Sequence, residues 1–140
     1  MRRKPTWEDA DLLLRIHDLE SRPETQKAFD WFRAHQTALV NLPEAEFQRG
    51  TLEFEYGLRI AIQFELIGVL VKMGMLNEQA VLEFWNVWDP WRVFRLTIER
   101  ERKVIGSWWV ENFEWLAQRD ERWRARRNRR SPSERRSRSP

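Results

Sequence analysis

A carboxylate in an apolar stretch is the first candidate for acid–base chemistry in this chain. Glu65 lies in residues 58–76, the most apolar region of the sequence. A carboxyl group in a low-dielectric environment holds its proton more tightly, which suits a general acid. The alternative, which we favour, is a structural ion pair with Arg95 or Arg102, because a charge that leaves water must be paired or neutralised. Glu65 is therefore predicted to stabilise the fold.

The sequence lacks the other common catalytic and metal-binding patterns. Its two histidines, His17 and His35, belong to no Glu-x-x-His or His-Glu-x-x-His motif, so neither a di-iron bundle nor that type of zinc site is expected. Ser21 and Ser107 are better explained as helix starts, and the chain has no cysteine and no glycine-rich phosphate loop. We predict no metal, no cofactor and no enzymatic activity. An enzyme whose pocket carries no recognisable motif remains a lesser alternative.

A basic C-terminal segment offers clearer binding chemistry. Residues 119–140 contain ten arginines and three acidic residues, a net charge of +7, whereas residues 1–118 carry −4. Arginine binds phosphate through a planar fork of donors, and an exposed aromatic ring such as Trp123 can stack on a base. We predict that this segment contacts nucleic acid electrostatically, with little sequence preference. The predicted contact residues are Arg119, Arg122, Trp123, Arg124, Arg126, Arg127, Arg129, Arg130, Arg135, Arg136 and Arg138.

Other partners remain open for this segment. Arginines around an aromatic residue also suit an anionic membrane surface, and an unidentified protein is a further candidate. The segment is expected to be helical at first, but beyond Arg127 it contains no aliphatic or aromatic side chain, so we expect disorder there. The predicted organisation is a helical domain over 1–118 and a tail over 119–140. Truncation after Gln118 should remove binding and leave the domain folded.

The elements that position these residues are predicted to be helices. Capping residues, early prolines and acidic first turns precede apolar residues at helical spacing. Asp89 is predicted to be an N-cap followed by Pro90 at the first helical position, and Ser107 is predicted to cap a last helix that can continue through Arg127. Trp85, Trp88 and Trp91 recur every three residues, which is typical of core at a helix junction. The predicted helices begin near Trp7, Ser21, residue 45, Asn77, Pro90 and Ser107.

The central stretch has an ambiguous pattern. Residues 52–64 alternate between apolar and mostly polar or small types, which is typical of a strand. The same stretch contains two apolar stripes with i, i+4 spacing, and no other segment alternates to pair with it. We interpret 45–73 as a helix buried on more than one side, with Ile60 and Phe64 buried together. The predicted fold is one compact all-α bundle of five or six helices around this central helix, with a disordered basic tail.

No membrane-spanning or secretory segment is expected. The longest uncharged apolar run, 66–71, is far shorter than the roughly 20 residues that span a bilayer. The basic start of the chain is followed by acidic residues and only a short apolar run, unlike a signal peptide. We therefore expect a cytoplasmic protein.

Several motifs resemble one family. The matching residues are Phe-Glu-Leu-Ile-Gly at 64–68, Asn-Phe-Glu-Trp-Leu-Ala at 112–117, and Trp91 and Arg102 between these two segments. With them the chain resembles a family of uncharacterised bacterial all-helical domains that have a Phe-Glu-x-Ile-Gly central helix. The likeness covers about residues 21–118. It implies an all-helical fold and no known reaction. Trp91 and Arg102 are expected to be structural, and Gly68 is expected to let another helix approach closely.

Overall fold

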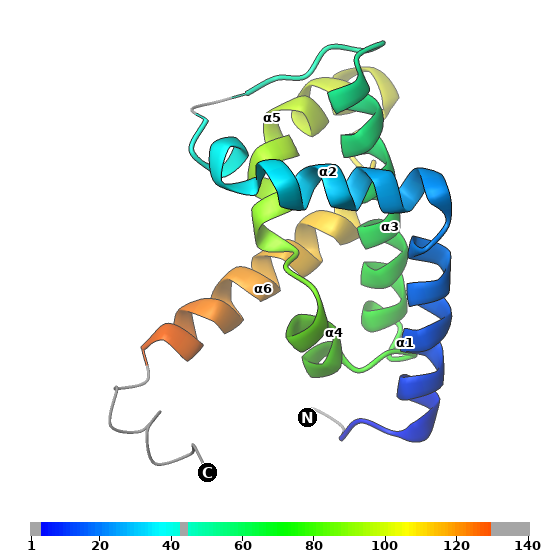
Figure 1. Cartoon of the computed structure of the whole chain (residues 1–140). Helices are drawn as coiled ribbons and strands as arrows, with labels where there is room; N and C mark the ends of the chain where they lie inside the picture. Colours follow the sequence, from blue (N-terminus) through cyan, green and yellow to red (C-terminus); the bar gives the residue numbers. More distant parts are fainter. Residues whose placement is uncertain (1–3, 43–44, 130–140) are drawn as a thin grey trace.

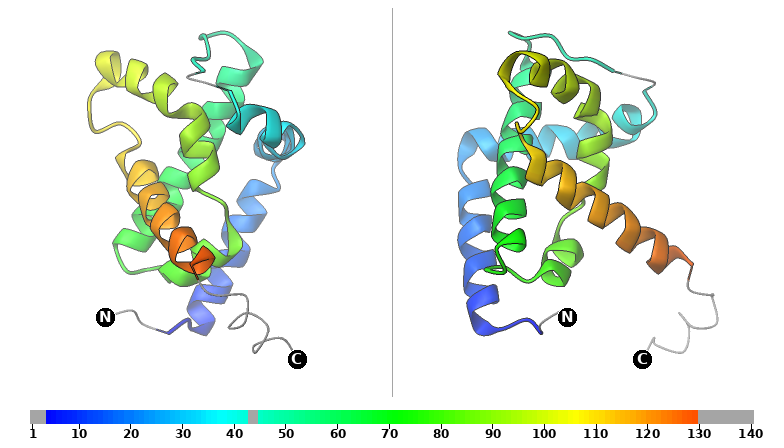
Figure 2. Two further views of the ribbon diagram at one scale, coloured as in Figure 1. Left: turned by 90° about the vertical axis from the view of Figure 1, so that its left-hand side faces the viewer. Right: turned by 180° about the vertical axis from the view of Figure 1, so that it is seen from behind.

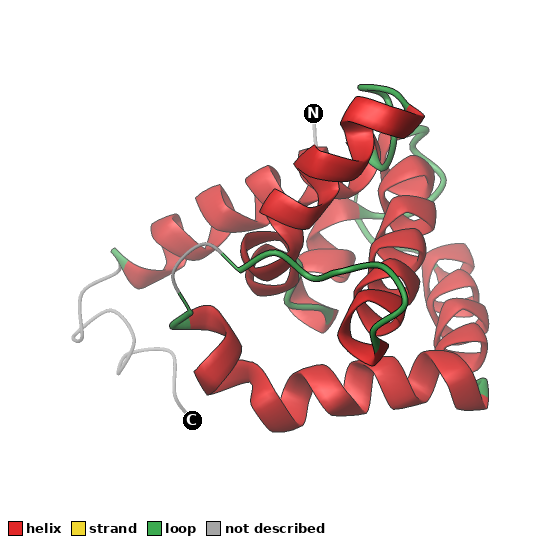
Figure 3. Ribbon diagram, turned by 90° about the horizontal axis from the view of Figure 1, so that it is seen from above, coloured by secondary structure: helices red, strands yellow, loops and turns green. Residues whose placement is uncertain are grey.

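Six helices make up the fold of the residues that the structure describes. The computed structural model describes residues 4–42 and 45–129, and Figure 3 shows that this part contains helices and loops but no strand. The all-α prediction with five or six helices is confirmed. The helices are α1 (Trp7–Glu20), α2 (Pro23–Val40), α3 (Leu52–Lys72), α4 (Glu78–Phe84), α5 (Trp88–Ile105) and α6 (Glu111–Asn128).

Helix α3 is the central element. It contacts α2, α5 and α6, and α1 runs alongside it in Figure 1. The helical interpretation of the alternating stretch is confirmed, since Ile60 and Phe64 are both buried. The helix begins at Leu52 rather than at residue 45, and Thr51 caps it by accepting the N–H of Phe54.

Burial of α3 is less complete than its two apolar stripes suggest. The stripe that contains Ile60 and Phe64 faces the core. Ile62 and Leu66, which belong to the second stripe, are 55% and 40% exposed. The neighbouring helices α2, α5 and α6 therefore bury α3 on more than one side but leave part of the second stripe exposed.

A buried carboxylate joins α1 to α4. Asp9 forms the expected capping box with Thr6: its Oδ2 accepts the N–H of Thr6 at 2.7 Å, and the Thr6 hydroxyl accepts the N–H of Asp9 at 3.4 Å. The other oxygen, Oδ1, accepts the N–H of Asn77 at 2.9 Å. Asn77 is itself the N-cap of α4. One side chain therefore fixes the starts of two helices relative to each other.

The starts of α5 and α6 differ from the predictions. Helix α5 begins at Trp88, so Asp89 and Pro90 lie inside its first turn and Asp89 is not the N-cap. Helix α6 begins at Glu111 rather than after Ser107, and its N-cap, Val110, has a left-handed backbone with φ of 47°. Neither N-cap makes a side-chain hydrogen bond of its own. Asn86, just before α5, accepts the N–H of Asp89 at 3.1 Å, and carboxylates of other helices supply further capping groups for α5 and α6.

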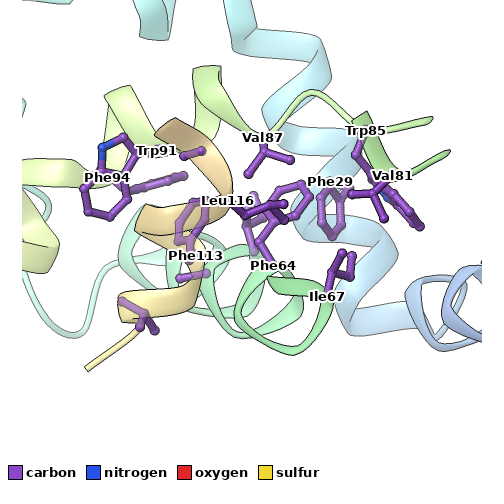
Figure 4. Close-up of a cluster of buried hydrophobic side chains, with 14 of the residues drawn as sticks. Phe29, Phe64, Ile67, Val81, Trp85, Val87, Trp91, Phe94, Phe113 and Leu116 are labelled. Atoms are coloured by element: carbon purple, nitrogen blue, oxygen red, sulfur yellow. The ribbon is translucent and has the colours of Figure 1, made fainter. Parts of the chain in front are cut away.

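The core combines aromatic and aliphatic residues of several helices (Figure 4). The rings of Phe64 and Phe113 stack with centroids 5.5 Å apart, and Trp91 meets Phe113 edge-on at 5.4 Å. Gly68 lies where α6 approaches α3: a Cβ there would be 2.5 Å from the carbonyl oxygen of Asn112. The absence of a side chain at this position lets the two helices pack closely.

No helix in the described part of the chain is both long enough and apolar enough to cross a membrane.

Candidate functional site

The C-terminal half of α6 carries the basic residues that the sequence singles out. This half of the helix projects away from α3, as the right-hand view of Figure 2 shows. Its arginines fall into two sets, one bonded to acidic residues of the fold and one without acidic partners. Arg130, Arg135, Arg136 and Arg138 lie outside the described residues.

The first set anchors α6. Arg124 donates to Oδ1 of Asp120 at 3.0 Å and to the carbonyl oxygen of Trp85 at 3.3 Å. Arg127 lies 3.6 Å from the carboxylate of Glu83 on α4. Because Asp120 is completely buried, its pairing with Arg124 stabilises a charge that would otherwise be isolated. These two arginines therefore serve the fold.

Arg119 is also held by the fold. Its guanidinium donates to both oxygens of Glu78 on α4, through Nε and through Nη2, the latter at 3.1 Å. It also lies over the Trp115 ring, 5.2 Å from the centroid. The hydrogen bonds to the Glu78 carboxylate raise the pKa of Arg119. Its charge is thus fixed in position and largely matched by a single acidic partner.

The second set consists of Arg122, Arg126 and Arg129. All three side chains are exposed, and none makes an ion pair or side-chain hydrogen bond to another residue within 4–42 or 45–129. Their spacing of four and three places them on one face of α6, in line with Arg119. We call Arg122, Arg126 and Arg129 the open arginine face.

A depression adjoins this face. It has a volume of about 130 Å³ and lies between α4 and α6, lined by Glu78, Leu82, Arg119, Arg122 and Arg126. Sequence reasoning missed Glu78 and Leu82, because no local pattern indicates that α4 packs beside the basic part of α6.

Trp123 does not match its prediction. It is half-buried and packs against the core instead of standing exposed among the arginines. The guanidinium carbons of Arg124 and Arg127 lie 5.9 Å and 5.1 Å from its ring centroid. The ring is therefore an internal cation–π partner, and a base that stacked on it would have to displace an arginine.

Glu65 has partners other than those predicted. Its Oε2 accepts the N–H of Phe113 at 2.8 Å, and its Oε1 accepts the side-chain amide of Asn112 at 2.8 Å. Arg102 instead donates to the carbonyl oxygen of Trp109 and to Glu114, and lies 5.7 Å from the centroid of the buried Trp91 ring. The expected ion pair with Arg95 or Arg102 is wrong, because the carboxylate caps the N-terminus of α6.

Groups that often take part in catalysis are dispersed. His17 and His35 are exposed on α1 and α2, and Nδ1 of His35 lies 2.8 Å from the carbonyl oxygen of Trp31. Among the described residues, no group of three or more His, Asp or Glu side chains is placed to hold a metal ion.

The tail boundary suggested by the charge pattern falls inside α6. Gln118 lies in mid-helix, and the buried Asp120 follows two residues later. A truncation after Gln118 would remove both this carboxylate and the anchoring arginines. Asn128, the last helical residue, is the position after which a cut leaves α6 whole.

Comparison with known proteins gives a family but no activity. No curated protein and no solved structure shows significant similarity to the chain. One family matches residues 5–123, which is most of the chain and includes the first part of the open arginine face. This agrees with the likeness of the central and C-terminal motifs to an uncharacterised helical family. The chain belongs to the family described as Domain of unknown function (DUF4760).

Proposed function

We propose that this protein is a non-enzymatic helical module that binds nucleic acid through the basic face of α6 and the arginines that follow it in the sequence. The open arginine face carries the proposal. Arg122, Arg126 and Arg129 are exposed, aligned and without acidic partners in the described structure. Arginines in this arrangement are suited to phosphates spaced along a backbone.

The anchoring contacts make this face a rigid one. Arg119 is bonded to Glu78, Arg124 to Asp120 and Trp85, and Arg127 to Glu83. These contacts hold α6 against the rest of the domain, so the open arginines need not order a helix when they bind. The proposal places the protein in the cytoplasm, where nucleic acid is accessible.

An anionic membrane surface is the second candidate. A helix that lies in a membrane interface needs an apolar face to insert beside its basic residues. The apolar face of α6, including Phe113 and Leu116, is in the core, and Trp123 is covered by two arginines. Nucleic acid therefore fits this surface better, because phosphate contacts need no apolar insertion.

The fold reduces the charge available for binding. Residues 119–140 carry a net charge of +7, but Arg119 and Arg127 face Glu78 and Glu83 from outside that segment. About five positive charges then remain to neutralise phosphates. The logarithm of the association constant for duplex DNA should fall with the logarithm of salt concentration at a slope of about −4.5.

Titration of the full chain against duplex DNA, single-stranded RNA and phosphatidylglycerol vesicles at several salt concentrations tests the proposal. Nucleic acid should bind with this slope and with little dependence on sequence. The chain truncated after Asn128 keeps α6, but residues 119–128 carry +3, or about +1 once Glu78 and Glu83 are counted, so its slope should drop to about −1. Binding to the vesicles alone, or binding that salt does not affect, would contradict the proposal.

A further inference from the structure

The depression between α4 and α6 is small and strongly basic. Three arginines and one glutamate line it, together with Leu82. Its volume of about 130 Å³ corresponds to roughly four water molecules. Pockets that enclose a drug-sized ligand begin at roughly 300 Å³. A space of this size accommodates a single tetrahedral anion.

One of the three arginines that line the depression is paired with a carboxylate, and the other two are not. Glu78 bonds both of its oxygens to Arg119, and this pairing fixes one guanidinium at the wall. Arg122 and Arg126 lie one helical turn apart and have no acidic partner in the described structure. Like charges at i, i+4 repel each other, so an anion between them removes an unfavourable interaction as well as adding hydrogen bonds.

Phosphate is the anion that this arrangement recognises best. Each arginine presents a planar fork of N–H donors that matches two oxygens of a phosphate group. A carboxylate holds its two oxygens in one plane, whereas the two non-bridging oxygens of a backbone phosphate diverge from a tetrahedral centre, so each can accept from a different arginine on neighbouring turns. Arg129 continues the same face beyond the depression, where the next phosphate of a backbone would lie.

We infer that the depression binds one backbone phosphate of a nucleic acid, with Arg122 and Arg126 as its ligands and Arg119 as a positioning residue. This inference rests on the proposed function and names its specific site. One phosphate enters the depression, and the bases stay outside it. The site therefore sets how the strand lies on α6 without reading its sequence.

Glu78 gives the inference a distinctive signature. In the wild-type protein its carboxylate holds Arg119 and reduces the positive charge of the depression. Glu78→Gln should release the charge of Arg119 toward the bound phosphate, so affinity should rise and the salt slope should become steeper by about one unit. Glu83→Gln is the matched control, because Glu83 pairs with Arg127 and does not line the depression.

The decisive experiment measures the salt slope of duplex DNA binding for full-length variants by fluorescence anisotropy. Arg122→Gln and Arg126→Gln should each lower the magnitude of the slope by about one unit and weaken binding equally for unrelated DNA sequences. Arg95→Gln is the control: this arginine is exposed on α5, has no acidic partner in the described structure and does not line the depression. Circular dichroism melts should show that all variants remain folded.

The outcomes separate the inference from the proposed function. If Arg122→Gln and Arg126→Gln change the slope no more than Arg95→Gln does, the inferred phosphate site is wrong. The proposed function is then retained as diffuse electrostatic binding of nucleic acid. If the full-length protein binds no nucleic acid, both are overturned. If phosphatidylglycerol vesicles bind with the same dependence on Arg122 and Arg126 while nucleic acid does not, the site belongs to a lipid headgroup and the inference is wrong.

Discussion

The carboxylate of Glu65, in the middle of α3, accepts the backbone N–H of Phe113 in the first turn of α6 at 2.8 Å. Since the first N–H groups of a helix have no partner within it, the contact supplies a cap that α6 lacks locally. The same arrangement recurs at α5, where Oδ2 of Asp120 accepts the N–H groups of Val87 and Trp88 at 2.8 and 2.9 Å. Two helices are therefore capped by carboxylates from distant parts of the chain.

The first prediction concerns Glu65. Glu65→Gln keeps an acceptor but loses the negative charge that interacts with the N-terminus of α6, so stability should fall by about 1–2 kcal/mol. The measurement is urea unfolding at neutral pH. Glu55→Gln, an exposed change on the same helix, should alter stability by less than about 0.5 kcal/mol. Equal effects of the two substitutions would show that the cap contributes nothing.

The second prediction concerns Asp120, which is completely buried. Asp120→Ala leaves two backbone N–H groups at the start of α5 and the guanidinium of Arg124 without their acceptor, so we expect a loss of about 3–5 kcal/mol. Asp120→Asn retains an oxygen and should cost about 1–2 kcal/mol.

Two truncations give an independent check of Asp120. A chain that ends at Gln118 lacks this carboxylate, whereas a chain that ends at Asn128 keeps it. The shorter chain should lose cooperative thermal unfolding, and the longer one should melt like the full-length protein. If both melt alike, the contact between Asp120 and α5 is not needed for the fold.

These contacts show where sequence reasoning succeeds and where it stops. The capping box at Thr6 and Asp9 is local, so its pattern predicts the start of α1 correctly. The same rules place the start of α5 at Asp89 and Pro90 and that of α6 at Ser107, and both placements are wrong. Asn86 caps α5 locally by accepting the N–H of Asp89, but the carboxylates that cap α5 and α6 lie 32 or more residues away in the sequence, where no local pattern contains them.

The sequence predicts which arginines form the basic site, but it does not predict which of them are paired with acidic residues of the fold. The arginines of residues 119–140 are conspicuous in the sequence, and periodicity alone puts Arg122, Arg126 and Arg129 on one face. What separates them from Arg124 and Arg127 is contact with Asp120 and Glu83. The pair of Arg124 with Asp120 is an i, i+4 pair within α6, whereas the pair of Arg127 with Glu83 depends on how α6 packs beside α4. Tertiary packing also turns Trp123 toward the core, which composition cannot indicate.

The third prediction concerns Gly68. An added Cβ would lie 2.5 Å from the backbone oxygen of Asn112, which cannot move without shifting α6. Gly68→Ala should therefore destabilise the protein by about 1–3 kcal/mol despite the higher helix propensity of alanine. At Gly57 the added Cβ would lie 2.5 Å from the ring of Phe94, which is buried among other aromatic rings, so Gly57→Ala should also destabilise the protein. Thermal melts of both variants test these losses.

The fourth prediction is a pH dependence at Glu101. Hydrogen bonds from Arg49, which donates to both carboxylate oxygens, lower the pKa of the buried Glu101. A carboxyl whose pKa is lower in the folded state stabilises the fold above its unfolded value of 4.5, and this stability is lost as the pH falls through the folded pKa. Glu101→Gln should therefore destabilise the protein at pH 7 and lose less stability than the wild type below pH 4.5.

Glu20 should show the opposite sign. Burial raises the pKa of Glu20, although the hydrogen bond from the Trp85 indole, 2.6 Å long, partly opposes this effect. Its contribution to stability is present below pH 4.5 and is lost as the pH rises through the folded pKa. Urea unfolding of Glu20→Gln and Glu101→Gln between pH 3 and pH 7 should give differences from the wild type that change in opposite directions.

The fifth prediction separates the two sets of arginines. Replacing Arg122, Arg126 and Arg129 by glutamine removes three charges that have no acidic partner in the described structure, so stability should stay within about 0.5 kcal/mol of the wild type. The magnitude of the salt slope for duplex DNA should fall by about 2.7, which is 0.9 for each lost phosphate contact.

In the matched variant, glutamine replaces Arg119, Arg124 and Arg127. This change removes three positive charges from the same helix, as the first variant does. Their loss leaves the buried Asp120 without its cation and releases Glu78 and Glu83, so stability should fall by about 2–4 kcal/mol. Below its melting temperature this variant should keep a steeper salt slope than the first, because the open arginine face is intact. If the two variants lose the same affinity and the same stability, anchoring and open arginines do not differ in their contributions to folding and binding. Net charge alone then accounts for binding.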